Sequence, residues 1–434
     1  MWPCTMKVEK SIINKIAYVL LALLITSFSA PQALSLPQLS QFPYIQRPTT
    51  SSVVIVWETY DPALCSIEYG MNSVLDQRTQ LAGSGKRHVA ALNGLRPNAT
   101  YSYRILAEDI PLMDAATFRT NRDESHPEFS FVVFGDSGTG DHNQARVAAQ
   151  IHRVEADFGL ITGDVVYPRG ASEDYESKYF LPYRDIISSI CFYPTMGNHD
   201  YYTDNGKPYL DTFVLPANNP AKSEKYYSFD YGNAHIVSID SVLPTNGPEE
   251  KEQFEWVRQD LASSRKLWKF AFLHHPPYST SLHGSEMRIR RRYSPLFEEY
   301  DVDIVFCGHD HNYQRTVKIK EFFPEKEGVV YIVTGGGGGH LYDIGRSARI
   351  AFAKKIFHFV HVKINKESLE LSAIDDRGNE FDSLSLDKSS SKAVWIRWGA
   401  VVFLIVFAGA IILKTGLMRS RKATNSSTDT CDIG

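Results

Sequence analysis

The chain has 434 residues, of which 43% are hydrophobic and 22% are charged, and its formal net charge is -4. This length accommodates about two or three domains with real cores, and the composition excludes a disordered chain. With 46 basic and 50 acidic residues, the sequence gives no electrostatic reason to expect nucleic-acid binding. Five cysteines are too few for a scaffold built on disulfides.

The N-terminal residues 1–35 have the layout of a secretory signal peptide. Lys7, Lys10 and Lys15 precede an apolar run over residues 16–28, and small residues follow. An uncleaved N-terminal anchor is the alternative, although the run is shorter than the ~20 residues that a membrane span needs. Both interpretations predict export.

Residues 393–413 predict a single transmembrane helix near the other end of the chain. The segment is about one bilayer thickness of apolar sequence, and Trp395 and Trp398 stand where interfacial aromatic residues are typical. Basic residues follow it, so the positive-inside rule predicts a cytoplasmic tail over 414–434 and an exported ectodomain. Residues 387–392 predict a short linker before the helix. The protein is therefore expected in a membrane, with one pass.

Residues 36–122 predict a small all-β domain. Short alternating or apolar runs are separated by turn residues, which is typical of a β-sandwich. Leu95-Arg96-Pro97, followed by Tyr101 and Tyr103, resembles the closing part of a fibronectin type III module, in which a tyrosine fixes a corner. The segment contains no cluster of groups that could carry out chemistry.

A second domain is predicted over residues 126–386, with an α/β pattern. Apolar strand candidates alternate with helices expected at 143–156, 173–189, 249–264 and 295–300, and hairpins are expected at 226–240 and 358–375. This alternation predicts a sheet that is covered by helices, and ligands are expected to bind at the carboxyl ends of its strands. Cys65, Cys191 and Cys307 are widely separated and odd in number, which predicts buried thiols.

Five short motifs directly follow five predicted buried strands. They are Gly135-Asp136-Ser137-Gly138, Gly163-Asp164-Val165-Val166-Tyr167, Gly197-Asn198-His199-Asp200, His274-His275-Pro276-Pro277 and Gly308-His309-Asp310-His311. Each motif alone is a weak signal, but five at successive strand ends predict one shared metal site. The set has Asp, Tyr, Asn and His but no thiolate, which suits Fe(III), Zn(II), Mn(II) or Fe(II) rather than a structural zinc. It is large enough for two ions.

These motifs resemble those of the calcineurin-like metallophosphoesterases and, among them, the purple acid phosphatases. Other members place a histidine where this chain has Gly138, and Tyr167 supplies the replacement ligand of the purple acid phosphatase pattern. The resemblance covers about residues 36–386, because a fibronectin-like domain ahead of the catalytic domain is also this family's arrangement. It implies a metallophosphoesterase sandwich of sheets flanked by helices, of the α/β (α+β) class.

The resemblance also implies which residues hold the metals. Fe(III) would be held by Asp136, Tyr167 and His311, the divalent ion (Fe, Zn or Mn) by Asn198, His274 and His309, and Asp164 would bridge the two. The neighbouring His275 leaves the assignment of His274 open by one residue.

The implied activity is that of an acid phosphatase acting on small phosphate monoesters, with a metal-bound hydroxide attacking phosphorus in line with the leaving alcohol. His199 would donate to a phosphoryl oxygen, and His283 would protonate the leaving alkoxide. Family members often have a second histidine after the latter, where this chain has Gly284, so the strength of leaving-group assistance is open.

Two other functions are compatible with the sequence. A phosphodiesterase acting on nucleotides or lipid head groups would use the same two-metal site. An adhesion or receptor ectodomain would keep the fold without activity, but no expected ligand is missing here.

Several further features are expected to lie outside the site. Gly335–Gly339 lacks a following GK[ST] and predicts a flexible loop at the rim, and the arginines at 288 and 290–292 predict a solvated basic face. Six histidines have no motif context and are not assigned to the site: His142, His152, His235, His340, His358 and His361.

Overall fold

The computed structural model describes residues 37–244 and 246–389. The predicted signal peptide at 1–35 and the predicted transmembrane helix at 393–413 lie outside the described residues, as does the tail. Among the residues described, none of the helices combines the length and the apolar character that a membrane crossing requires.

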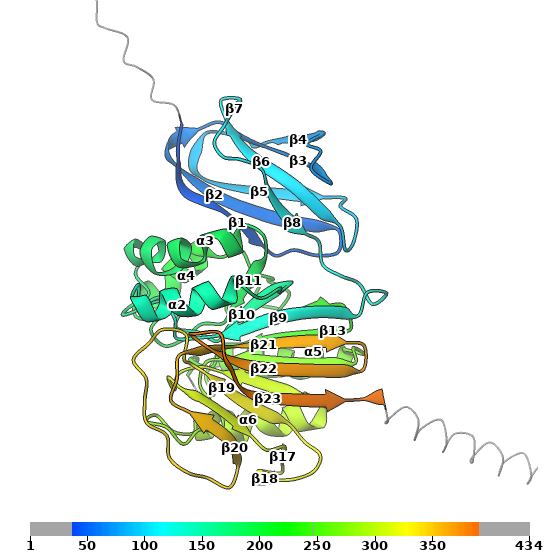
Figure 1. Cartoon of the computed structure of the whole chain (residues 1–434), viewed down its shortest axis with the longest axis vertical. Coiled ribbons are helices and arrows are strands. Elements are labelled where there is room, and N and C mark those ends of the chain that lie inside the picture. Colours follow the sequence, from blue (N-terminus) through cyan, green and yellow to red (C-terminus); the bar gives the residue numbers. More distant parts are fainter. Residues whose placement is uncertain (1–36, 245, 390–434) are drawn as a thin grey trace, which may run out of the picture.

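Two β-sheets form the N-terminal part of the structure (Figure 1). The first contains β1 (Leu39–Gln46), β2 (Ser52–Ala63) and β5 (Gly85–Asn93). The second contains β3 (Cys65–Met71), β4 (Gln77–Gln80), β6 (Thr100–Ala107), β7 (Ile110–Pro111) and β8 (Ala116–Arg119). The fully buried rings of Trp57 and Tyr103 belong to their core. The hydroxyl of Tyr101 accepts a hydrogen bond from the backbone N–H of Arg96 at 3.0 Å, so the contact expected of a tyrosine corner is present.

Hydrogen bonds join this β region to the larger α/β region. The hydroxyl of Tyr44 donates to the carbonyl of Thr212 at 2.5 Å, and that of Tyr103 donates to the carbonyl of Ser188 at 2.8 Å. These bonds satisfy polar groups that packing between the two regions removes from water.

The α/β region contains two larger sheets. The six-stranded sheet has the order β11 (Cys191–Pro194), β10 (Phe158–Ile161), β9 (Glu128–Phe134), β21 (His358–Asn365), β22 (Ser368–Asp375) and β23 (Glu380–Asp387). The seven-stranded sheet has the order β12 (Tyr227–Tyr231), β13 (Ala234–Ile239), β14 (Trp268–Leu273), β15 (Ile304–Cys307), β19 (Val330–Thr334), β16 (Tyr313–Thr316) and β20 (Ile350–Lys354). The short strands β17 (Ile319–Lys320) and β18 (Phe323–Pro324) pair separately.

These two sheets pack face to face. The ring of Phe131, on β9, lies 5.4 Å from that of Phe270 on β14 and 6.2 Å from that of Phe306 on β15. All three side chains are fully buried, so the main core lies between the sheets. The sandwich of sheets flanked by helices that the family resemblance implies is thus present, with helices on the outer face of each sheet.

Helices α2 (His142–Ile151) and α3 (Leu181–Ile187) lie against the six-stranded sheet. The side chain of Asp141 caps α2 by accepting hydrogen bonds from two backbone N–H groups. In α3, the ring of Tyr183 packs 5.3 Å from Phe134 and 5.6 Å from Phe192. A 3₁₀-helix (Ser172–Asp174) and a π-helical turn (Glu176–Phe180) precede α3, and a second 3₁₀-helix (Asp204–Gly206) precedes α4 (Lys207–Thr212).

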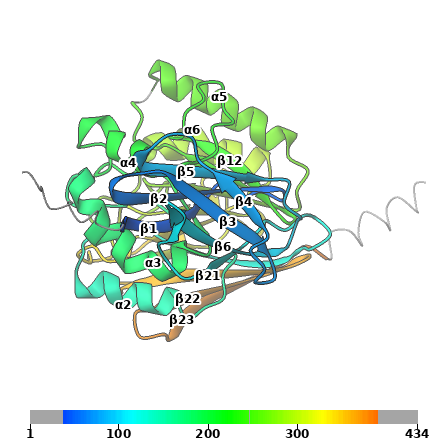
Figure 2. The ribbon, with the colours of Figure 1, turned by 90° about the horizontal axis from the view of Figure 1, so that it is seen from above.

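Helices α5 (Pro248–Ser263) and α6 (Met287–Glu299) cover the seven-stranded sheet through apolar side chains such as Val257 and Phe297. Figure 2 places them on the opposite side of the molecule from β22 and β23. Helix α6 corresponds to the helix predicted at 295–300, but it begins earlier, at Met287, and contains Pro295 in its interior.

The basic run at 288–292 is part of α6, and three of its four arginines, including Arg292 with Glu250, are bonded to neighbouring groups rather than forming a free basic face. The guanidinium of Arg288 donates to the carbonyls of Ser241 and Leu243, and that of Arg290 donates to the carbonyl of Pro277. These arginines fasten the helix to neighbouring loops.

The strand directions place the five motifs at one rim. Strands β9, β10 and β11 are parallel to one another, as are β13, β14, β15 and β19. Each motif follows the carboxyl end of β9, β10, β11, β14 or β15. Neighbouring parallel strands therefore present the motif side chains to a common space.

Two polar clusters lie at the other end of these strands. His235, at the start of β13, has one ring nitrogen 2.8 Å from Asp230 and the other 2.9 Å from Asp260. The ammonium of Lys388, just after β23, contacts the carboxylate of Asp303 at 2.6 Å and donates to the carbonyl of Leu267 at 2.7 Å. Both clusters fasten chain segments to the sheet far from the motifs.

The three cysteines among the described residues are Cys65, Cys191 and Cys307, and all are free and buried, as predicted. Burial raises the pKa of the Cys191 thiol to about 12, because the thiolate would lose its solvation. These thiols are unreactive core residues.

Candidate metal centre

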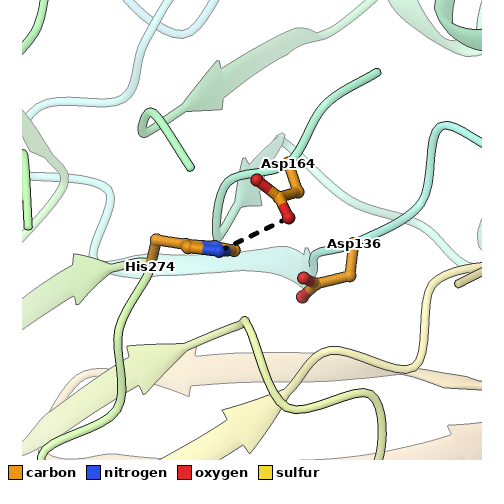
Figure 3. A group of neighbouring side chains, drawn as sticks. All are labelled: Asp136, Asp164 and His274. Atoms are coloured by element: carbon orange, nitrogen blue, oxygen red, sulfur yellow. Dashed lines mark ion pairs between the residues drawn. The ribbon is translucent and has the colours of Figure 1, made fainter. Parts of the chain in front are cut away.

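Three side chains from three motifs form a buried cluster: Asp136, Asp164 and His274 (Figure 3). One ligand atom from each lies within 4.8 Å of the others, and Nε2 of His274 is 3.5 Å from Oδ2 of Asp164. Two buried carboxylates this close are costly unless a cation or a proton compensates them. The arrangement therefore favours a bound cation.

The backbone at this cluster is unusual. Asp136, Asp164 and His309 have φ values of 56°, 51° and 70°, which lie in the left-handed region that residues other than glycine rarely adopt. Conformations of this kind cost roughly 1–3 kcal/mol each and gather at functional sites. Three of the motif residues are thus held in conformations that aim their side chains at a common point.

Tyr167 lies against the same carboxylates. Its hydroxyl oxygen is 3.1 Å from Oδ1 of Asp136, 2.9 Å from Oδ2 of Asp164 and 2.9 Å from Nε2 of His311. One hydroxyl proton cannot serve three acceptors. Burial and the two carboxylates also raise the pKa of this phenol well above its usual range. A cation shared by these atoms resolves the conflict, so the residues present fit a metal on this side.

Asn198 and His309 complete a second group of ligand atoms around His274. Nε2 of His274 is 3.1 Å from Oδ1 of Asn198 and 3.2 Å from Nδ1 of His309. The Nδ1–H of His274 donates to the carbonyl of Thr162 at 2.8 Å, which leaves Nε2 with a lone pair facing the amide oxygen. Two acceptors that face each other are again reconciled by a cation, so a second ion fits here.

Hydrogen bonds outside the centre fix the orientation of two more histidines. Nδ1 of His311 donates to the carbonyl of His340 at 2.7 Å, so its Nε2 faces the carboxylates. Nδ1 of His199 donates to the carbonyl of Pro168 at 2.6 Å, and its Nε2 lies 3.9 Å from Asp164. The ring of His199 is partly exposed, as a residue that meets a substrate must be.

The structure distinguishes between the adjacent histidines of the fourth motif. His274 lies in the cluster, whereas Nδ1 of His275 lies 3.0 Å from the hydroxyl of Ser241. Burial lowers the pKa of His275 to about 2, because the charged ring would lose its solvation. His275 is therefore a neutral, buried neighbour.

His283 lies beside the centre on a loop held by a buried carboxylate. Its ring centroid is 4.2 Å from that of His309, and its backbone N–H donates to Oδ1 of Asp310 at 3.1 Å. The same carboxylate accepts a hydrogen bond from the hydroxyl of Ser279. We assigned no role to Asp310 from the sequence, although its place between two ligands in Gly308-His309-Asp310-His311 was a signal that could have been used.

Asp200 joins the loops of two motifs. It is fully buried and accepts hydrogen bonds from the N–H of Gly197 at 2.8 Å and from that of Val165 at 3.0 Å. Burial, followed by the charge of Asp164, raises its pKa. Asp200 therefore holds together the two loops that carry Asp164 and Asn198.

The glycine run at residues 335–339 is buried, so the prediction of a flexible loop at the rim is wrong. The N–H of Gly337 donates to the carbonyl of Gly135 at 3.0 Å, and that of Gly339 donates to the carbonyl of Asp136 at 2.8 Å. A Cβ atom on Gly339 would lie 2.6 Å from Cε1 of His311. The run consists of glycine because backbone must approach the first motif and a ligand ring this closely.

Tyr342, just after this loop, is a residue that the sequence did not indicate. Its ring stacks on that of His311 at 4.4 Å with an interplanar angle of 13°, and it lies 5.3 Å from the ring of His283. No spacing rule connects position 342 to the motifs, so the contact could be found only in the structure.

Comparison with known families is consistent with this geometry. Residues 129–313 match the family model for calcineurin-like phosphoesterases. In sequence, the chain is 30% identical over 267 residues to purple acid phosphatase 21 of Arabidopsis thaliana, covering 59% of each chain. It is 25% identical over 360 residues to an uncharacterised protein of Mycobacterium tuberculosis, covering 67% of this chain and 68% of that one.

Among solved structures, the fold is similar to that of the purple acid phosphatase PPD1 from yellow lupin seeds, with a TM-score of 0.71 at 21% identity. The similarity covers 81% of this chain and 74% of the lupin chain. At that identity the comparison concerns the fold alone.

Proposed function

Because the chain contains a calcineurin-like phosphoesterase domain and is related to the purple acid phosphatases, we propose that it hydrolyses small phosphate monoesters at a dinuclear metal centre, as an acid phosphatase. The observation that carries the proposal is the position of Tyr167, whose hydroxyl oxygen lies within 3.1 Å of a carboxylate oxygen of both Asp136 and Asp164. A phenolate ligand suits Fe(III), and a second group of ligand atoms lies next to it.

The proposed metal ligands divide into two sets that share one carboxylate. Fe(III) would be held by Asp136, Tyr167 and His311, a divalent ion (Fe, Zn or Mn) by Asn198, His274 and His309, with Asp164 common to both. When bound, the two ions would lower the pKa of the attacking water and neutralise charge on the phosphoryl oxygens.

His199 is proposed to donate to a phosphoryl oxygen. Its Nδ1 proton is committed to the carbonyl of Pro168, so its Nε2 can donate only when the ring is doubly protonated. The hydrogen bond to Pro168 thus fixes which ring nitrogen of His199 faces the substrate side.

His283 is proposed to protonate the leaving alkoxide. The side chain is exposed beside His309, and Asp310 holds its backbone in place. Exposure allows the ring to exchange its proton with water between turnovers, and the anchored backbone keeps it on one side of the centre.

The protein is further proposed to be exported and held at a membrane by residues 393–413. The support is the sequence: a lysine-flanked apolar segment at the N-terminus and an apolar segment followed by basic residues near the C-terminus. Protease added to intact cells should remove the phosphatase activity while leaving a tag at the C-terminus protected; a protected catalytic domain would contradict export.

The metal assignment is tested by colour and composition. The purified full chain should contain iron and a divalent metal in equal amounts and show a visible phenolate-to-iron band. Tyr167→Phe should abolish the band, whereas Tyr342→Phe, which changes another tyrosine beside His311, should keep it. A band unaffected by Tyr167→Phe would refute the ligand assignment.

The role of His283 is tested by the leaving group. His283→Ala should slow alkyl phosphates far more than activated aryl phosphates, because only poor leaving groups need a proton. His152→Ala, at an exposed histidine at the end of α2, should affect both classes equally little. Equal losses for His283→Ala would remove the role. Faster turnover of bis(4-nitrophenyl) phosphate than of 4-nitrophenyl phosphate would favour the phosphodiesterase alternative.

A further inference from the structure

A cavity of about 470 Å³ lies between two loops next to the metal centre. One wall is the segment at 280–282, which directly precedes His283, and the other is the segment at 340–345, which follows the glycine run; Lys355 completes the lining. This volume falls in the range of small-molecule sites. The proposed chemistry assigns no role to the cavity.

The two walls are bonded to each other. The hydroxyl of Ser281 donates to the carbonyl of Asp343 at 2.9 Å. The N–H of Gly345 donates to the carbonyl of Thr280 at 2.8 Å, and the hydroxyl of Thr280 donates to the carbonyl of Gly345 at 3.3 Å. The cavity is therefore a formed feature whose two loops hold each other in place.

Tyr342 connects the cavity to the metal centre. It lines the cavity, its backbone N–H donates to the carbonyl of His311 at 3.0 Å, and its ring stacks on the His311 ring. The ring of His283 is 5.3 Å away from it. A general acid lies next to the group that it protonates, so the leaving alcohol of a substrate would emerge on this side.

The lining contains four apolar or aromatic side chains beside its polar ones. Leu282 is 70% exposed, and Leu341, Tyr342 and Ile344 are each partly exposed. The ammonium of Lys355 is 2.8 Å from the carboxylate of Asp343, so the charges on the lining form a pair. An exposed leucine beside a cavity with paired charges favours an apolar occupant over an anionic one.

We propose that this cavity binds the alcohol portion of the substrate and selects a flat, apolar group such as an aryl ring. This inference rests on the proposed phosphomonoesterase function and adds a substrate class to it. Tyr342 offers a ring next to His311, and Leu282 offers an exposed apolar side chain in the lining. Esters of small polyols would leave these side chains in contact with water and gain nothing from them.

The test compares two esters whose leaving groups have nearly equal acidity but different area, phenyl phosphate and 2-naphthyl phosphate. The full chain with its metals should hydrolyse the naphthyl ester with a kcat/KM roughly tenfold higher, because the second ring adds apolar contact. Leu282→Ser should lower this ratio roughly threefold or more. Leu181→Ser makes the same change at a leucine that is 58% exposed on α3 and outside the cavity lining, and should leave the ratio as it is.

Binding provides a readout that does not depend on turnover. The fluorescence of 2-naphthol titrated with the protein should report binding that Leu282→Ser weakens and Leu181→Ser does not. Equal kcat/KM for the two esters, or equal effects of the two serine variants, would overturn the inference and leave the proposed function standing. If no ester releases phosphate, the proposed function fails, and naphthol binding that is insensitive to Leu282→Ser would then overturn the cavity assignment as well.

Discussion

Replacing His235 by glutamine should make the stability of the protein much less sensitive to alkaline pH. The imidazole is 6% exposed and lies between the carboxylates of Asp230 and Asp260, at 2.8 and 2.9 Å. Burial by itself would lower its pKa, but hydrogen bonds and charge from the two carboxylates outweigh burial and raise the pKa to about 9. The ring is thus an imidazolium at neutral pH in the folded protein.

The magnitude follows from the difference between the folded and unfolded states. A pKa of about 9 on folding against 6.5 in the unfolded chain corresponds to roughly 3 kcal/mol. Since the folded-state pKa is the higher one, this stabilisation is fully present below pH 6.5 and is lost as the pH rises through 9. The ammonium of Lys266 lies 3.7 Å from Asp230 in wild type. Lys266 is also present in His235→Gln, so its effect on the free energy of unfolding cancels when the two proteins are compared.

The assay is urea unfolding of wild type and His235→Gln at intervals from pH 5.5 to 9.5. The free energy of unfolding is taken from the first transition of each curve. The difference in the free energy of unfolding should be largest below pH 6.5 and shrink by roughly 3 kcal/mol by pH 9.5. His358→Gln is the control, because burial lowers the pKa of His358 to about 4 and its ring stays neutral throughout the upper range. A difference for His235→Gln that does not change with pH would refute the ion-pair reasoning.

Three further outcomes are expected. Gly339→Ala should lower kcat in a phosphatase assay by roughly 10- to 100-fold, because the new Cβ would displace the ring of His311. The control is Gly85→Ala, where a Cβ meets only an ordinary contact. Equal effects of the two substitutions would contradict this prediction. Asp382→Ala should lower the free energy of unfolding, measured in urea, by about 2–4 kcal/mol. The reason is that the guanidinium of Arg315 would lose the carboxylate to which it donates two hydrogen bonds of 2.7 and 2.8 Å. A loss below about 1 kcal/mol would show that water replaces the carboxylate. Removing the metals with a chelator should lower the unfolding midpoint in differential scanning calorimetry, because the buried carboxylates lose their counter-charge. Restoring the metals should raise the midpoint again. An unchanged midpoint would argue against a bound cation.

The arrangement of strands and motifs could be predicted because it depends on local residue patterns. Buried β-strands followed by Gly-Asp, Gly-Asn-His or Gly-His are visible as apolar runs with a polar end, and parallel strands bring such ends together. The hairpins around Tyr231 and Lys366 were predicted for the same reason, since alternating runs flank short turns.

Other features depend on contacts that no local pattern encodes. The start of α6 was placed too late because Pro295 is ordinarily a helix breaker, and in this helix its surroundings tolerate it. The glycine run was predicted as a loose loop because its packing partners, the first motif and His311, are distant in sequence. Tyr342 and the anchoring of the His283 loop by Asp310 are likewise long-range contacts.

Lys388 holds the end of the described chain on the side of the sheet opposite the five motifs. Its bonds to Leu267 and Asp303 hold the last described residues at the amino ends of β14 and β15, whereas the metal ligands follow the carboxyl ends. A strand of six residues such as β14 separates the two ends by about 20 Å. The described chain therefore ends on the side of the sheet opposite the one that carries the metal ligands.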